Sequence, residues 1–168
     1  MEDDRLFETL CLAIRQIREP RLFSTERGYQ GQLATELDKL IEDQPDAILR
    51  PLVEQEYQKT AHAHRITLRP DIIVHIPFDR GVSPTRNYDN HLVILLKLAA
   101  NQKKAEEDFA DLETICSVLD YPLGVFVNIT SRQVFLPEYH RQVKGPFGLR
   151  EVAVDLQHGQ PTLLTAAS

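Results

Sequence analysis

The chain has 168 residues, of which 42% are hydrophobic and 26% are charged, and its formal net charge is −6. This size fits one domain spanning residues 1–168, and the composition argues against long disorder or a fibrous chain. The longest aliphatic run, residues 92–96, is far shorter than the roughly 20 apolar residues that a membrane helix needs. We therefore expect no membrane partner. Because the acidic first residues differ from a signal peptide, we also expect a cytoplasmic protein.

The first part of the chain predicts a helical segment over residues 1–45. Apolar residues spaced i, i+4, i+8 and i+11 indicate a helix over residues 4–19, which Pro20 ends. A second apolar stripe predicts a helix over residues 26–43.

Short runs rich in Val, Ile and Leu follow the two helices. They predict strands over residues 52–57, 65–76 and 91–98. Residues 77–90 contain two prolines and a glycine among polar residues, which predicts a long loop between the second and third strands.

Asn101 can cap a third helix over residues 102–119, which has its own apolar stripe. Residues 123–129 form a continuous apolar run, typical of a strand that is covered on both faces. The order of elements predicts an α/β sandwich in which an antiparallel hairpin leads into a crossover helix and a further strand.

The C-terminal part, residues 131–168, gives weaker signals. Short apolar runs indicate strands over residues 133–136 and 150–156. Residues 157–168 have the composition of a loose tail.

Lys97 interrupts a predicted strand that is otherwise apolar. Alternate residues of a strand share a face, so Lys97 lies with Val93 and Leu95. A buried ammonium group is costly unless it is paired, so an acidic side chain should lie near it. Alternatively, Lys97 lies at the end of the strand and its flexible side chain reaches solvent.

Glu36 is a second polar residue at an unusual place. Its spacing from Tyr29, Leu33 and Leu40 puts it on the inward stripe of the second predicted helix. Two interpretations stay open: a functional carboxylate, or a residue at the margin of the stripe that pairs with a nearby arginine.

Several features follow one another in a recognisable order. They are Glu36 in the helix before the sheet, residues 54–57 on the first strand, Pro70 and Asp71 opening the second strand, Lys97 on the third strand and residues 123–129 after the crossover helix. Over about residues 28–130 these features together resemble the PD-(D/E)xK nuclease superfamily. The resemblance implies a restriction-endonuclease-like three-layer α/β/α sandwich with a mixed central sheet. It also implies Asp71 and Glu36 as ligands of Mg²⁺ or Mn²⁺, and Lys97 as the catalytic lysine.

The sequence departs from the family pattern two residues before Lys97. The pattern requires Glu or Asp at this position, and the chain has Leu95. Mg²⁺ prefers oxygen ligands, and a leucine supplies none. A carboxylate could reach the same place from another element, and the candidates are Glu54, Glu56 and Asp108.

Two hypotheses about function follow. The first is an active DNA nuclease that depends on a divalent metal and uses Asp71, Glu36, Lys97 and a carboxylate from another element. The second is a weakly active or inactive relative that acts as a module binding nucleic acid or protein, and that needs no cofactor. The arginines of residues 77–90 suit either a DNA contact or a homodimer contact. The residues expected to contact nucleic acid are Arg65, Arg69, Arg80 and Arg86.

Overall fold

The computed structural model describes residues 2–42, 51–55, 67–76, 90–139 and 145–168. Within these residues the chain forms an α/β protein with a six-stranded mixed sheet packed against three helices. The helices are α1 (Glu2–Gln16), α2 (Glu26–Glu42) and α4 (Gln102–Leu119), and the 3₁₀ turns are η1 (Pro20–Ser24) and η2 (Leu136–Glu138). The strands are β1 (Leu52–Gln55), β2 (Ile72–His75), β3 (Asn90–Leu98), β4 (Leu123–Ile129), β5 (Gly148–Gln157) and β6 (Gln160–Ala167).

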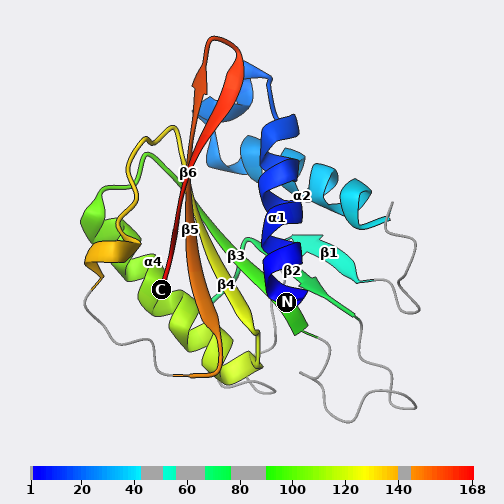
Figure 1. Cartoon of the computed structure of the whole chain (residues 1–168), viewed down its shortest axis with the longest axis vertical. Coiled ribbons are helices and arrows are strands. Elements are labelled where there is room, and N and C mark those ends of the chain that lie inside the picture. Colours follow the sequence, from blue (N-terminus) through cyan, green and yellow to red (C-terminus); the bar gives the residue numbers. More distant parts are fainter. Residues whose placement is uncertain (1, 43–50, 56–66, 77–89, 140–144) are drawn as a thin grey trace.

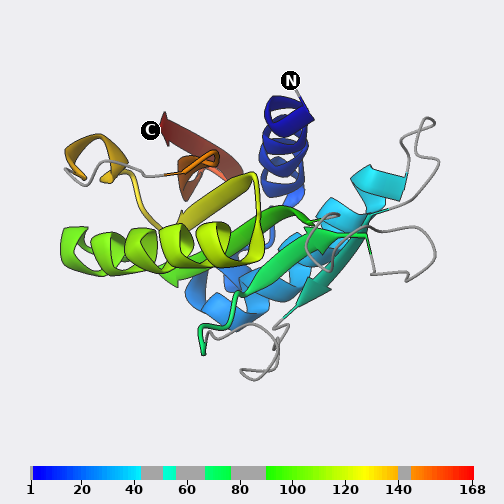
Figure 2. The ribbon, with the colours of Figure 1, turned by 90° about the horizontal axis from the view of Figure 1, so that it is seen from below.

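Helices cover both faces of the sheet (Figures 1 and 2). One apolar cluster joins α1 and α2 to the sheet, and Leu92, Ile94 and Leu96 of β3 belong to it. A second cluster joins α4 to the opposite face and contains Val93 and Leu95 of the same strand. The predicted division of the third strand into two faces is therefore confirmed.

The strands lie in the sheet in chain order, from β1 to β6. The pairs β1–β2 and β2–β3 are antiparallel, and α4 then carries the chain across to β4, which is parallel to β3. The bounds of α4 and β4 agree with the sequence prediction, and the side chain of Asn101 caps α4 by accepting a hydrogen bond from the backbone N–H of Lys104. β5 is parallel to β4.

The prediction of a loose C-terminal tail is wrong. β5 turns through His158 and Gly159 into β6, which pairs with it antiparallel as far as Ala167. Both turn residues have positive φ, 50° and 75°, as a two-residue hairpin turn requires. Pro161 lies within β6, and an edge strand accepts a proline.

Two predicted strands also need correction. Residues 133–136 form no strand, because Phe135 and Leu136 donate their backbone N–H groups to the Glu151 carboxylate instead of to a neighbouring strand. The second strand begins at Ile72, later than predicted, because Pro70 has no N–H to pair. Part of that predicted strand, and most of the predicted loop 77–90, lie outside the described residues.

Among the described helices, none combines the length and the apolar character that would let it cross a membrane.

Candidate functional site

Asp71 lies where β2 begins beside β3, the strand that continues past it. Its backbone N–H donates to the carbonyl of Ile94 at 3.2 Å, and its side-chain Oδ2 accepts a hydrogen bond from the N–H of Leu96 at 2.7 Å. From α2, Gln30 donates its side-chain amide to the Asp71 carbonyl at 2.8 Å. Both the backbone and the carboxylate of Asp71 are therefore held by neighbouring elements.

The Glu26 carboxylate also accepts a hydrogen bond from β3, at the next backbone N–H on the same side of the strand. Its Oε2 accepts a hydrogen bond from the N–H of Leu98 at 3.2 Å. Backbone N–H groups at the side of a strand need an acceptor, and here carboxylates of Asp71 and Glu26 supply it beyond the start of β2. The sequence reasoning missed Glu26. Its position four residues before Gln30, on the same side of α2, was the available signal.

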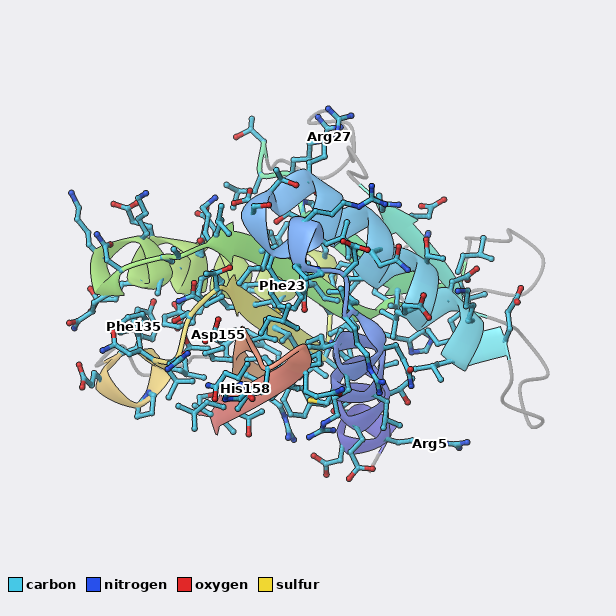
Figure 3. All side chains as sticks on the ribbon, turned by 90° about the horizontal axis from the view of Figure 1, so that it is seen from above. Arg5, Phe23, Arg27, Phe135, Asp155 and His158 are labelled. Atoms are coloured by element: carbon cyan, nitrogen blue, oxygen red, sulfur yellow. The ribbon has the colours of Figure 1, made fainter. Side chains whose placement is uncertain are left out.

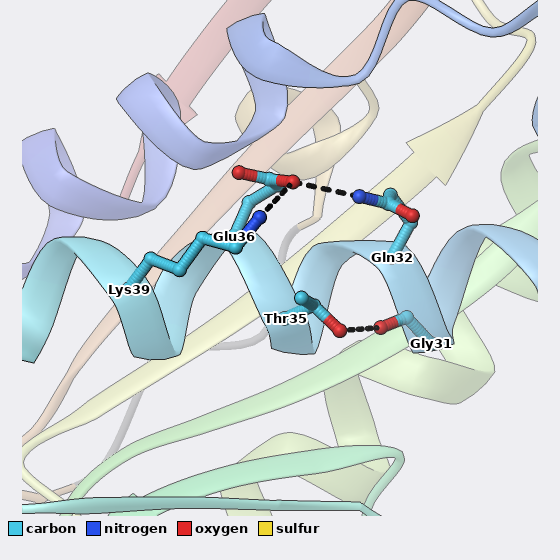
Figure 4. A network of polar contacts seen from close by, with 5 residues as sticks. All are labelled: Gly31, Gln32, Thr35, Glu36 and Lys39. Carbon is cyan, nitrogen blue, oxygen red and sulfur yellow. Dashed lines mark hydrogen bonds and ion pairs between the residues drawn. The ribbon is translucent and has the colours of Figure 1, made fainter.

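Glu36, the acid expected from the helix, makes its described contacts within α2. Its Oε1 accepts hydrogen bonds from the Gln32 amide at 2.7 Å and from Lys39 Nζ at 3.0 Å (Figure 4). It follows Gln30, which touches Asp71, by six residues, or about 9 Å along the helix. The structure thus brings Glu26, rather than Glu36, to the part of β3 that extends beyond the start of β2.

Lys97 projects from the α4 side of β3 and has an acidic neighbour, as the sequence analysis expected. Its Nζ lies 3.9 Å from Oδ1 of Asp108 on α4. The Lys97 side chain is 41% exposed, whereas that of Asp108 is 12% exposed. Lys97 therefore both pairs with an acid and reaches solvent, and Asp108 faces the sheet.

Burial raises the pKa of Asp108 to about 6, since a desolvated carboxylate resists ionisation. The nearby Lys97 ammonium opposes this increase, while the charges of Asp111, Asp71 and Glu26 add to it. Among the described residues, Oδ2 of Asp108 has no hydrogen-bond partner. Burial also raises the pKa of Asp111, one turn further along α4, and Lys97 again opposes the increase.

Leu95 fills the position where the family pattern has an acid. It is 7% exposed and belongs to the apolar cluster under α4. In that cluster it contributes to the core, and its side chain has no oxygen that could bind a metal. The other acid candidate on the sheet, Glu54, instead contacts Nε2 of His75 at 2.9 Å. His75 follows Asp71 by four residues, about 13 Å along an extended chain.

The described residues do not fit the divalent metal centre that the family resemblance implies. They contain no group of three or more His, Cys, Asp or Glu side chains arranged to hold a metal ion. Mg²⁺ needs near-octahedral oxygen coordination. Here Asp71 Oδ2 already accepts a hydrogen bond from the backbone N–H of Leu96. The position where the family pattern has a second acid is the buried Leu95.

Of the four arginines expected to contact nucleic acid, the structure describes Arg69, which is exposed and lies two residues before Asp71. Arg65, Arg80 and Arg86, like the acid candidate Glu56, lie outside the described residues.

Comparisons of the chain with protein-family models, with curated proteins and with solved structures yield no match.

Proposed function

We propose that this chain is a relative of the PD-(D/E)xK nucleases that has lost its metal site and binds nucleic acid without cleaving it. Three features support a restriction-endonuclease-like fold. A helix precedes three antiparallel strands, a crossover helix leads to a parallel strand, and helices cover both faces of the sheet. The aspartate of the resemblance lies directly before β2 and the lysine lies on the neighbouring strand β3, at the same end of the β2–β3 pair.

The observation that carries the proposal is the buried side chain of Leu95. It lies on the α4 face of β3, two residues before Lys97, at the position where the family pattern has a second carboxylate. Phosphodiester cleavage by this route needs a metal to generate the nucleophile and to stabilise charge on the phosphate. Because the chain has fewer metal ligands than the family pattern, the remaining residues support binding of nucleic acid without its cleavage.

Exposed cations near this end of the sheet favour nucleic acid as the partner. Lys103 and Lys104 lie exposed in the first turn of α4, and Arg27 follows Glu26 in α2. Lys97 lies near the end of β3, and Arg69 lies two residues before Asp71. Such cations bind phosphates whatever the base sequence.

Cleavage is tested with single- and double-stranded DNA in Mg²⁺ or Mn²⁺, with wild type, Asp71→Ala and Leu95→Glu side by side. We expect no cleavage by wild type, and metal-dependent cleavage or metal binding only after Leu95→Glu. Cleavage by wild type that disappears in both Asp71→Ala and Asp108→Asn would overturn the proposal. It would support an active nuclease instead, because Asp108 is the carboxylate that reaches Lys97, at 3.9 Å.

Binding is tested by titrating labelled DNA at several salt concentrations. We expect affinity to fall steeply as salt rises, and the salt slope to decrease by about 0.9 for each phosphate contact removed. The variant Arg27→Ala with Lys104→Ala should weaken binding. Arg5→Ala is the matched control, because Arg5 is an exposed arginine on α1, far from Arg27 in Figure 3. Equal losses in both variants, or no binding at all, would turn attention to a protein partner.

A further inference from the structure

β6 is an edge strand that has little of the usual protection of such strands. Natural proteins keep edge strands from pairing with other chains by short length, charged side chains, prolines, bulges or a covering helix or loop. β6 has eight residues, its pairing with β5 is continuous, and its sequence QPTLLTAA contains no charge and one proline, at the second position. Leu164, in the second half of the strand, is 48% exposed. The opposite edge, β1, has four residues and carries Glu54.

The hairpin turn determines which backbone groups of β6 point away from the sheet. A two-residue turn is closed by a hydrogen-bonded pair, here Gln157 and Gln160, and hydrogen-bonded pairs then alternate along the ladder. The bond from the N–H of Ser168 to the carbonyl of Leu149 agrees with this alternation. The outward backbone groups therefore belong to Pro161, Leu163, Thr165 and Ala167.

We propose that β6 pairs antiparallel with β6 of a second copy of this chain, about a two-fold axis at Leu164. This inference is independent of the proposed function. In this register Leu163 of one copy lies opposite Thr165 of the other, and each donates its N–H to the carbonyl of its partner. Pro161 lies opposite Ala167, whose N–H bonds to the proline carbonyl. The sheets of the two copies become continuous.

The details of the strand fit this register. Pro161 is the residue that lacks an N–H, and it lies at the end of the pairing, where one missing bond disturbs no neighbour. The two Leu164 residues lie opposite each other as a pair without backbone hydrogen bonds between them. In antiparallel sheets the side chains of such pairs lie closer together than those of hydrogen-bonded pairs. Their exposed surfaces are then buried against each other.

A second copy is the occupant that the strand itself favours. An antiparallel pair of identical strands satisfies two-fold symmetry, so one surface serves both partners. The net charge of −6 makes two copies repel each other in general, but β6 brings no charge to the contact. A contact of one strand is smaller than a standard interface, so we expect the dimer to form reversibly and to depend on concentration.

The first test is the mass of the full chain in solution, measured by sedimentation equilibrium over about a hundredfold range of concentration. Wild type should change from 19.2 kDa to twice that mass. Leu164→Lys should raise the dissociation constant at least about tenfold, because two ammonium groups meet at the axis. Leu12→Lys is the matched control, since Leu12 on α1 is 49% exposed and lies outside β6, and it should leave the dimer unchanged.

Two further variants test the register. Thr165→Pro removes an outward N–H that β5 does not use, so it should weaken the dimer while the melting temperature of the monomer changes little. Leu164→Cys should form a disulfide-linked dimer on mild oxidation, whereas Leu12→Cys should not. The native Cys11 and Cys116 are buried and do not interfere. A monomer at every concentration, a dimer that Leu12→Lys disrupts, or a dimer that survives both Leu164→Lys and Thr165→Pro would overturn the proposal.

Discussion

The Asp71 carboxylate accepts a hydrogen bond from the backbone N–H of Leu96 at 2.7 Å, at the place where a longer β2 would supply a carbonyl oxygen. An aspartate expected to bind a metal thus completes the sheet. Glu26 has the same role at Leu98. Asp71 therefore has a structural role that does not depend on a metal.

Replacing Asp71 should separate its structural role from any catalytic role. Asp71→Ala leaves the N–H of Leu96 without its acceptor and should lower the free energy of unfolding by about 1–3 kcal/mol. Asp71→Asn keeps an acceptor oxygen and should restore most of this loss. Urea denaturation of the three proteins measures the difference. If Asn is as destabilising as Ala, the charge of Asp71, rather than the hydrogen bond, stabilises the fold.

Asp108 should make stability depend on pH in the acidic range. Its pKa is about 6 in the folded protein and near 3.8 in the unfolded chain, so the folded state holds the proton more tightly. Below about pH 4 the Asp108 carboxyl is protonated in both states, so its burial does not lower the free energy of unfolding. The free energy of unfolding then falls as the pH rises from 4 to 6, by at most roughly 3 kcal/mol, and stays level above that.

Asp108→Asn should remove this component of the pH dependence. The measurement is urea denaturation of wild type and variant at several pH values, and the quantity compared is the difference between the two proteins, which cancels the other carboxylates. Lys97→Met should move the fall toward higher pH, because the Lys97 ammonium lowers the pKa of Asp108. A difference that is constant from pH 4 to 7 would contradict the assignment.

Leu95→Glu should make the fold responsive to metal. Burying a carboxylate in the apolar cluster under α4 should cost about 2–4 kcal/mol in the absence of metal. If the new carboxylate and Asp71 bind Mg²⁺ together, saturating metal should recover stability, by about 2.7 kcal/mol at a concentration one hundred times the dissociation constant. Thermal unfolding with and without Mg²⁺, against NaCl of equal ionic strength, measures this. Wild type should show no such shift, and a shift in wild type would contradict the proposed loss of the metal site.

The crossover helix and the strand after it could be predicted because their apolar side chains are the ones that the fold buries. Residues 102–119 and 123–129 are apolar on the faces that α4 and β4 bury, so pattern and burial agree. β6 was missed because edge strands need few apolar residues, and Pro161 obscured the pattern. The turn residues His158 and Gly159 were the clearer signal of a hairpin.

The candidate site was predictable in its strands and less so in its helix. Asp71 and Lys97 stand at strand positions where alternation defines the face, and Lys97 does meet an acid. In α2, the apolar stripe indicated Glu36, which contacts residues of its own helix. The acid that reaches β3 is Glu26, because the first turn of α2 is the part that lies beside that strand. Such contacts depend on how a helix is placed along the sheet, which periodicity does not report.

Glu151 should be the most sensitive polar residue of the core. It is fully buried, and its Oε2 accepts the N–H groups of Phe135 and Leu136 at 2.6 and 2.7 Å. Glu151→Ala should cost about 3 kcal/mol or more, since two buried donors lose their acceptor. Glu151→Gln keeps an acceptor and should cost less. Hydrogen exchange of the Phe135 and Leu136 amides should accelerate in the alanine variant, and unchanged exchange would show that the segment is held by other contacts.

Gly124 and Gly148 offer a matched pair for testing how closely the sheet packs against α4. A Cβ atom at Gly124 would lie 2.9 Å from Cys116 Sγ and 2.9 Å from a methyl carbon of Leu149, whereas at Gly148 its nearest neighbour is 4.0 Å away. Gly124→Ala should therefore lower the free energy of unfolding by about 1–3 kcal/mol, because α4 must shift to admit the methyl group. Gly148→Ala should be neutral or slightly stabilising, since it restricts the unfolded chain. Urea denaturation measures both, and equal effects would mean that α4 lies further from the sheet at Gly124 than these distances indicate.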